Sequence, residues 1–337
     1  MAYQNVGVPR FYIDIPTYIN SLGLPFTNVI VNNSLLTLEP IIAKKLFSGN
    51  DTQPSEQLVN VNLGNEFSYV YSDFCNPSNL YLAIINHNLG GDCGITINPN
   101  KHSNITNILN EMNKDTAQKG SSIATFSNDD DDSLAVSLTK NHDVGVDIFA
   151  GAFSFGTFYD MPVSPDLKIS MDLEFDGYDM ISTLGGSTLT NVRYAGSPMW
   201  FDKDKNKTEP FSVGDTKATS KRNGRRNWTL KFSYISDTDI FSSNYMSNNH
   251  LETSTEYDAN DIDSINTAFK DNINNDDSFT AQVLNKIGNG QRFIFQPDNT
   301  NNNPDQFAIC ILDQKSISIK QIAYKAYDIS LKIREVW

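Results

Sequence analysis

Histidine is the side chain that most readily combines metal binding with proton transfer near neutral pH, and this chain of 337 residues has four. They are His87, His102, His142 and His250, and no HExxH, HxH or Cys–His spacing joins any of them. His87 follows an apolar run directly, where its ring could contact a ligand, although strand ends routinely carry polar loop residues. The spacing therefore favours ordinary loop roles for the histidines over a metallohydrolase site.

Two acidic clusters could offer oxygen ligands to calcium. Asp129 to Asp132 are consecutive, and Asp258, Asp261 and Asp263 alternate with other residues. An EF-hand loop also needs a central glycine and a distal glutamate at fixed positions, and neither stretch has both. We therefore expect solvated acidic loops and no metal ligands, with calcium as the alternative.

Glycine pairs and nucleophile motifs are equally uninformative about catalysis. Gly90-Gly91-Asp92 and Gly185-Gly186-Ser187 match neither the phosphate loop nor the dinucleotide fingerprint, and the turn Gly-x-Ser-x-Gly is absent from the sequence. A Ser-His-Asp triad could be chosen freely from so polar a chain, which makes any choice arbitrary. The sequence predicts no enzyme, no catalytic residues and no cofactor; a glycan hydrolase with paired carboxylates is the remaining enzymatic alternative.

One basic cluster interrupts an acidic chain. Lys221, Arg222, Arg225 and Arg226 precede Trp228, whereas the whole sequence has 40 acidic against 26 basic residues and a net charge of −14. A chain so acidic is a poor nucleic-acid binder, so DNA passing nearby is the weaker explanation of the cluster. We expect these arginines to bind an acidic patch on a neighbouring subunit through bidentate contacts with its carboxylates.

The length of the chain and its cysteine content limit the possible architectures. A chain of 337 residues favours two domains, each able to form its own core. Cys75, Cys93 and Cys310 are an odd number without CxxC spacing, which predicts neither a disulfide framework nor a zinc site and fits assembly in a bacterial cytoplasm. No leader is visible and no apolar run reaches 18 residues, so we expect neither secretion nor a membrane span.

The N-terminal half alternates apolar and polar side chains in short segments. Residues 10–16 read as an edge strand ended by a proline, and residues 105–112 as a short amphipathic helix. Further strands are expected at residues 67–74, 80–85, 94–97, 134–138, 144–149 and 152–158. Short strands separated by turns predict a β-sandwich.

Two prolines between Met161 and Pro165 make that segment the expected linker. We therefore expect a first domain at residues 1–165 and a second at residues 166–337, with a polar insertion near 242–277. In the second domain a helix is expected at 279–287, and strands at 167–175, 227–235, 292–296, 307–312, 316–320 and 327–337.

The chain's last strand ends in an aromatic residue. Terminal residues usually fray unless they are paired, so we expect Val336 and Trp337 to be held by a sheet or by a neighbouring subunit. Arg222, Arg225, Arg226, Arg334 and Trp337 together form the candidate assembly interface.

Several pieces of the C-terminal half resemble the distal tail proteins of tailed bacteriophages. They are residues 187–200 with Arg193-Tyr194 and Trp200, Gly224 to Tyr234, Phe293 to Asp298, Gln306 to Cys310, and Leu331 to Trp337. The resemblance implies a tail-tube-like β-sandwich with a flanking helix. It further implies a homo-oligomer, a hexameric ring, in which the sheets of neighbours continue one another.

Asn79 to Leu89 resembles a strand and loop of the galactose-binding-like jelly rolls found in phage proteins. This resemblance implies a mainly β chain with an N-terminal jelly-roll domain that decorates a particle or connects its parts. The expected function is that of a structural virion protein in the tail or baseplate, which contacts other tail proteins but not nucleic acid directly. Recognition of a host glycan is the alternative function.

Overall fold

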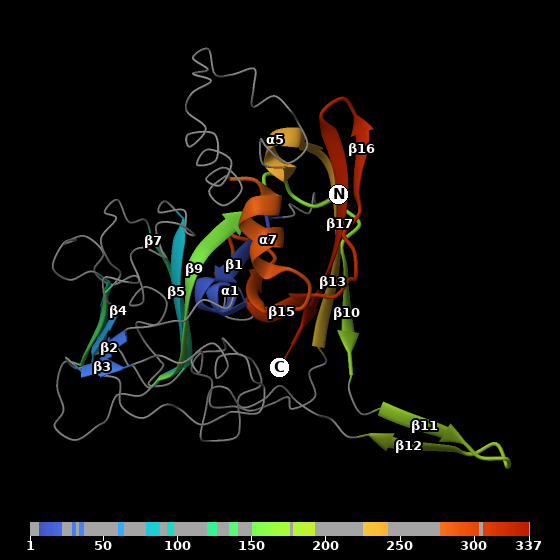
Figure 1. Cartoon of the computed structure of the whole chain (residues 1–337). Coiled ribbons are helices and arrows are strands. Elements are labelled where there is room, and N and C mark those ends of the chain that lie inside the picture. The colour runs from blue at the N-terminus through green and yellow to red at the C-terminus, as the bar shows by residue number, and fades with distance from the viewer. Residues whose placement is uncertain are drawn as a thin grey trace.

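The computed structural model describes thirteen segments of the chain. They are residues 7–21, 29–31, 34–36, 60–63, 79–87, 93–97, 120–126, 135–140, 150–175, 178–192, 225–241, 277–302 and 306–336. These segments are mainly β-strands in antiparallel pairs, with few helices (Figure 1). The predicted mainly β class is confirmed.

A ten-stranded sheet dominates the described structure. From one edge to the other its strands are β7 (Gly120–Phe126), β5 (Leu80–His87), β9 (Ala150–Asp160), β1 (Arg10–Asp14), β14 (Phe293–Gln296), β15 (Ala308–Leu312), β17 (Ala326–Glu335), β13 (Arg225–Ser236) and β10 (Ser170–Glu174), with β16 (Ile319–Ala323) paired to β17. Strands from both halves of the chain therefore share one sheet.

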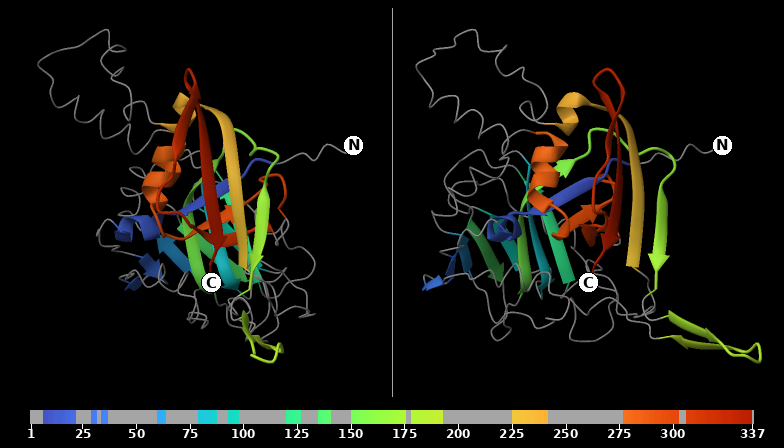
Figure 2. Two further views of the ribbon diagram at one scale, coloured as in Figure 1. Left: turned by 90° about the vertical axis from the view of Figure 1, so that its right-hand side faces the viewer. Right: turned by 45° about the vertical axis from the view of Figure 1, so that its right-hand side comes forward.

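Two smaller β-structures complete the strands. A five-stranded sheet follows the order β3 (Ser34–Leu36), β2 (Val29–Val31), β4 (Asn60–Leu63), β8 (Ala135–Lys140) and β6 (Cys93–Ile97). A hairpin of β11 (Tyr178–Ser182) and β12 (Thr188–Val192) points away from the main sheet in every view (Figures 1 and 2).

The strand β1 lies in the interior of the main sheet and not at its predicted edge. It pairs with β9 on one side and with β14 on the other, and Arg10 forms an ion pair of 2.6 Å with Asp160 on β9. The edge prediction was wrong because Pro16 was read as a strand breaker. Pro16 instead occupies the first turn of helix α1 (Ile15–Ser21), where a missing N–H costs little.

A buried polar network ties α1 to the sheet. The Asp14 carboxylate accepts hydrogen bonds from the Thr17 backbone N–H at 3.1 Å and from the Ser154 hydroxyl at 2.8 Å, and the latter also contacts the Tyr81 hydroxyl. The bond from Thr17 is the usual N-cap of a helix. The lack of a side chain at Gly156 on β9 allows β1 to approach closely, since a Cβ at this position would lie 2.1 Å from the Ile13 carbonyl oxygen.

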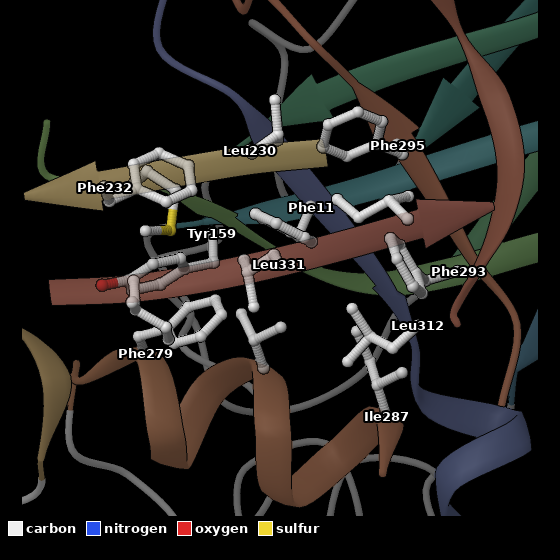
Figure 3. Packing of buried hydrophobic residues seen from close by; sticks show 14 of the residues in the cluster. Phe11, Tyr159, Leu230, Phe232, Phe279, Ile287, Phe293, Phe295, Leu312 and Leu331 are labelled. Atoms are coloured by element: carbon white, nitrogen blue, oxygen red, sulfur yellow. The ribbon is translucent and has the colours of Figure 1, made fainter. Parts of the chain in front are cut away.

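One apolar core joins the two halves of the chain. Phe279 and Ile287 point from a helical segment onto the sheet, where they meet a buried cluster that includes Phe11, Phe293 and Leu331 (Figure 3). The segment consists of a π-helical turn, η2 (Thr280–Leu284), followed by α7 (Asn285–Ile287). It ends at Gly288 and Gly290, both with positive φ, so the predicted helix at 279–287 is confirmed.

The expected linker packs against this core. Met161 is buried in the apolar cluster, and its backbone N–H donates to the Pro9 carbonyl at 3.0 Å. The sheet also crosses the expected boundary between residues 165 and 166, since β1 pairs directly with β14. Strands β1 and β9 thus belong to the core of the C-terminal half; division of the chain into two separable units stays a prediction.

Most strand predictions within the described segments are confirmed. Strands lie at 80–87, 93–97, 135–140, 150–160, 170–174, 225–236, 293–296, 308–312 and 326–335. The strand predicted at 316–320 is displaced along the chain, to 319–323. The predicted strands at 67–74 and 144–149, the helix at 105–112 and nearly all of the 242–277 insertion lie outside the described residues. The jelly-roll and tail-tube assignments stay predictions.

Replacing Asp14 with alanine tests the buried network. The change removes the helix cap and deprives the buried Ser154 hydroxyl of its acceptor, so we expect the free energy of unfolding to fall by about 1–3 kcal/mol. Urea unfolding followed by circular dichroism measures it. Ser21→Ala, at the exposed end of the same helix, is the matched control, and an equal effect of the two changes would contradict the network's role.

Candidate assembly surface

The structure separates the residues that the sequence grouped as an interface. Arg225 and Arg226 begin β13, and Arg334 lies near the end of β17. Arg222 and Trp337 lie outside the described residues, as does Lys221.

Arg226 is bound within its own chain. Its Nη2 lies 2.9 Å from Glu335 Oε1 and 3.0 Å from the Phe307 carbonyl oxygen, while its Nε and its backbone N–H each donate to Glu335 Oε2 at 3.0 Å. The guanidinium also lies over the Trp228 ring, 5.2 Å from its centroid. Because the Glu335 side chain is buried and that of Arg226 is only 16% exposed, this bidentate pair joins β13 to β17 as part of the fold.

The buried ion pair also affects its apolar surroundings. Burial raises the pKa of the Cys310 thiol well above its ordinary value; the nearby Glu335 carboxylate raises this pKa further, and the Arg226 charge opposes the increase. Cys310 is a free cysteine and therefore stays a neutral thiol that packs as a small apolar residue.

Arg334 has a partner on the opposite face of the sheet. Its Nη2 lies 2.8 Å from Glu174 Oε2, and the Asn227 amide donates to the same carboxylate at 3.3 Å. The hydrogen bond from Asn227 and the charges of Arg334 and Arg225 lower the pKa of Glu174, against the opposing effect of burial. This polar cluster attaches the edge strand β10 to β13 and β17.

The chain's last strand is held inside the sheet. Strand β17 lies between β13 and β15, and the Val336 backbone N–H donates to the Ile309 carbonyl at 2.9 Å. Of the two predicted explanations for an ordered C-terminus, pairing within the chain therefore accounts for residues 326–336. An assembly role for Arg222, Arg225, Arg226, Arg334 and Trp337 stays a prediction.

Strand β10 carries the exposed surface that sequence reasoning missed. Met171 lies opposite Trp228 and Leu173 opposite Arg226, and directly paired residues of antiparallel strands face the same side of a sheet. Because Trp228 belongs to the buried core, Met171 and Leu173 lie on the core face of the sheet. They are nevertheless 52% and 50% exposed.

The exposed apolar row continues beyond both ends of β10. Leu167, Ile169 and Phe175 continue the alternation and are 81%, 38% and 48% exposed. Figure 2 shows β10 at the edge of the sheet, beyond β13, whereas the helical segment η2–α7 lies over β1 and β17. The core face is thus wider than the layer that covers it, and we call residues Leu167, Ile169, Met171, Leu173 and Phe175 the open face.

The hairpin β11–β12 is the second exposed apolar element. Ile181 and Leu189 are direct cross-strand partners and are 60% and 61% exposed. Its turn is ordered by the Thr183 backbone N–H, which donates to the Ser187 carbonyl at 2.8 Å, and by Gly186 with φ 80°. Gly185, Gly186 and Ser187 therefore belong to the turn that joins β11 to β12.

The described residues offer little other chemistry. His87 was expected in the connection after the strand but is the last residue of β5. Within the segments that the structure describes, no group of three or more His, Cys, Asp or Glu side chains could hold a metal ion. The same segments contain no helix that is both long and apolar enough to cross a bilayer. The predicted acidic clusters lie outside the described residues.

Comparison with known proteins gives no relative: no family model, no curated protein and no solved structure matches this chain. The function must therefore be argued from the residues and their geometry.

Replacing Arg226 with methionine tests whether the buried ion pair stabilises the fold. The change leaves the Glu335 carboxylate buried without its bidentate partner, and we expect a loss of about 3–5 kcal/mol in the free energy of unfolding. Adding Glu335→Leu should restore most of that stability, because two apolar residues then replace the pair. Urea unfolding measures both variants; a loss below about 1 kcal/mol for Arg226→Met would show that the pair acts like an exposed one.

The lowered pKa of Glu174 predicts an acid-dependent loss of stability. In the folded chain this pKa lies below its ordinary value of 4.5, so the stabilisation is complete above that value and is lost as the pH falls through the lowered pKa. Wild type should therefore melt at a higher temperature than Glu174→Gln at pH 7, and the difference should vanish in acid. Thermal unfolding across pH 2–7 tests it, and a difference independent of pH would contradict it.

Proposed function

We propose that this chain is a structural virion protein of a tailed bacteriophage, which self-associates into a ring in the tail or baseplate. The proposal includes an N-terminal jelly-roll-like region, a C-terminal tail-tube-like region with a flanking helix, and a hexamer as the expected assembly. Association with copies of itself and with other tail proteins is the function; catalysis is not part of it.

The observation that carries the proposal is the open face. Single exposed apolar residues are common on soluble proteins, but here five occur at alternate positions along an edge strand and its flanking residues, and Met171 and Leu173 among them lie on the core face of the sheet. This surface continues the core of the same sheet, so its burial by another molecule would extend that core. An edge strand of this kind supports association as its role.

Two further observations support a structural protein. The residues resembling distal tail proteins include Gly224 to Tyr234, which overlaps β13, the strand beside the open face. Strand β10 is also attached to its neighbours by side chains, because Glu174 is bound by Arg334 and Asn227. A surface that is already ordered before association loses less conformational entropy on binding.

Polar substitution of the open face tests the proposal. We expect purified wild type to form an assembly of fixed copy number, and Met171→Thr with Leu173→Thr to give a folded monomer, because threonine keeps the strand propensity but removes apolar surface. Light scattering and native mass measurement give the copy number. Ser170→Thr, exposed on the opposite face of the same strand, is the matched control.

Two outcomes would contradict the proposal. A wild type that stays monomeric up to its solubility limit would exclude self-association and favour a recognition protein attached to a particle. Wild-type assembly by the double threonine variant would remove the open face from the interface.

A further inference from the structure

We propose that the hairpin β11–β12 of one copy covers the open face of the next copy. This inference rests on the proposed self-association and names the element that each partner contributes. It makes the interface heterologous, because one copy contributes a hairpin and the other a sheet face.

The distribution of exposed apolar side chains favours a second copy as the occupant. Among the described residues, nine of the twelve exposed large apolar side chains lie between Leu167 and Leu189. Five belong to the open face, and four belong to the hairpin: Met180, Ile181, Leu184 and Leu189. Each element alone needs an apolar cover, so two copies of one chain can supply both requirements at once.

The hairpin does not cover the open face of its own copy. It extends beyond the end of β10 and away from the sheet in all three views (Figures 1 and 2). The side chains of the open face are between 38% and 81% exposed in the same copy. Only residues 176 and 177 separate the described parts of the two elements. An element that projects from the body is placed to reach a neighbour.

The geometry of the two elements is compatible with packing face to face. The open face alternates with period two along β10, and Ile181 and Leu189 lie on one side of the hairpin. Apolar faces of two β-structures pack at about 10 Å, the arrangement of a β-sandwich. The hairpin would therefore add the layer that the helical segment provides over β1 and β17.

Pairing of hairpin with hairpin is the competing arrangement. That contact would be symmetric, would stop at a dimer and would leave the open face exposed in both copies. A contact between hairpin and open face instead covers both elements and can be repeated by each copy, so a ring can close. The structure thus favours the heterologous contact.

A mixing experiment separates the two arrangements. The first variant, Ile181→Thr with Leu189→Thr, has an altered hairpin and an intact open face; the second, Met171→Thr with Leu173→Thr, has the reverse. Each should be monomeric alone. Their equimolar mixture should form a heterodimer of twice 37.7 kDa and nothing larger, because one complementary pair of surfaces remains.

Control variants show whether a loss of assembly comes from the contact between hairpin and open face or from misfolding of the variant. Ser182→Thr in the hairpin and Ser170→Thr in β10 place threonine at exposed positions on the opposite sides of the same strands, and both should assemble as wild type does. Circular dichroism should give every variant a melting temperature near that of wild type. If a double variant melts early, the single changes Ile181→Thr and Met171→Thr enter the same mixing test.

Three other outcomes of the mixing experiment would overturn the proposed contact. A mixture that stays monomeric while wild type assembles would overturn the hairpin contact but leave self-association intact. Assembly by either double variant alone would also overturn it. A monomeric wild type would overturn this inference together with the proposed function.

Discussion

The core face of the main sheet is wider than the helical layer that covers it, and the account of this protein depends on that mismatch. The segment η2–α7 presses Phe279 and Ile287 onto the central strands, where the apolar cluster is fully buried. The same face continues through Trp228 on β13 to Met171 and Leu173 on β10, where half of each side chain is exposed. Burial of apolar surface is the main favourable term in association. Covering this exposed edge with another molecule would therefore stabilise the fold further.

The charged residues hold this edge in place on both sides of the sheet. Arg226 and Glu335 form the buried pair on the core face, and Arg334 binds Glu174 on the opposite face. Neither ion pair shields the apolar side chains of the open face from solvent. The first pair joins β13 to β17, and the second joins β17 to β10, so that the strand carrying Met171 and Leu173 is attached to the sheet by side chains as well as by backbone pairing.

The sequence predicts local structure well here because its alternation is regular. Residues 227–235 and the apolar run at 80–85 are strands as expected, and the stripe from Phe279 to Ile287 is a helix that ends at glycine. Pairing was not predictable in this way. Glu335 meets Arg226 across 109 residues, and a sequence does not reveal whether an arginine finds its carboxylate within the chain or on a neighbour.

The open face was missed for a related reason. Alternation over residues 167–175 predicts a strand with one apolar side, but the pattern is identical for a covered and an uncovered side. The position of β1 shows the same limit, because its pairing with β14 joins segments more than 280 residues apart. The order of the strands in the sheet determines which surface is exposed, and this order does not follow from knowing which residues form strands.

Amide hydrogen exchange as a function of protein concentration tests the central claim most directly. In a dilute, monomeric sample the backbone amides of residues 167–175 and 178–192 should exchange faster than those of β17, which lies inside the sheet. At concentrations where the protein assembles, both segments should become protected together while exchange of β17 stays unchanged. Unchanged exchange of residues 167–175 in the assembled protein would contradict the claim that a neighbour completes this core.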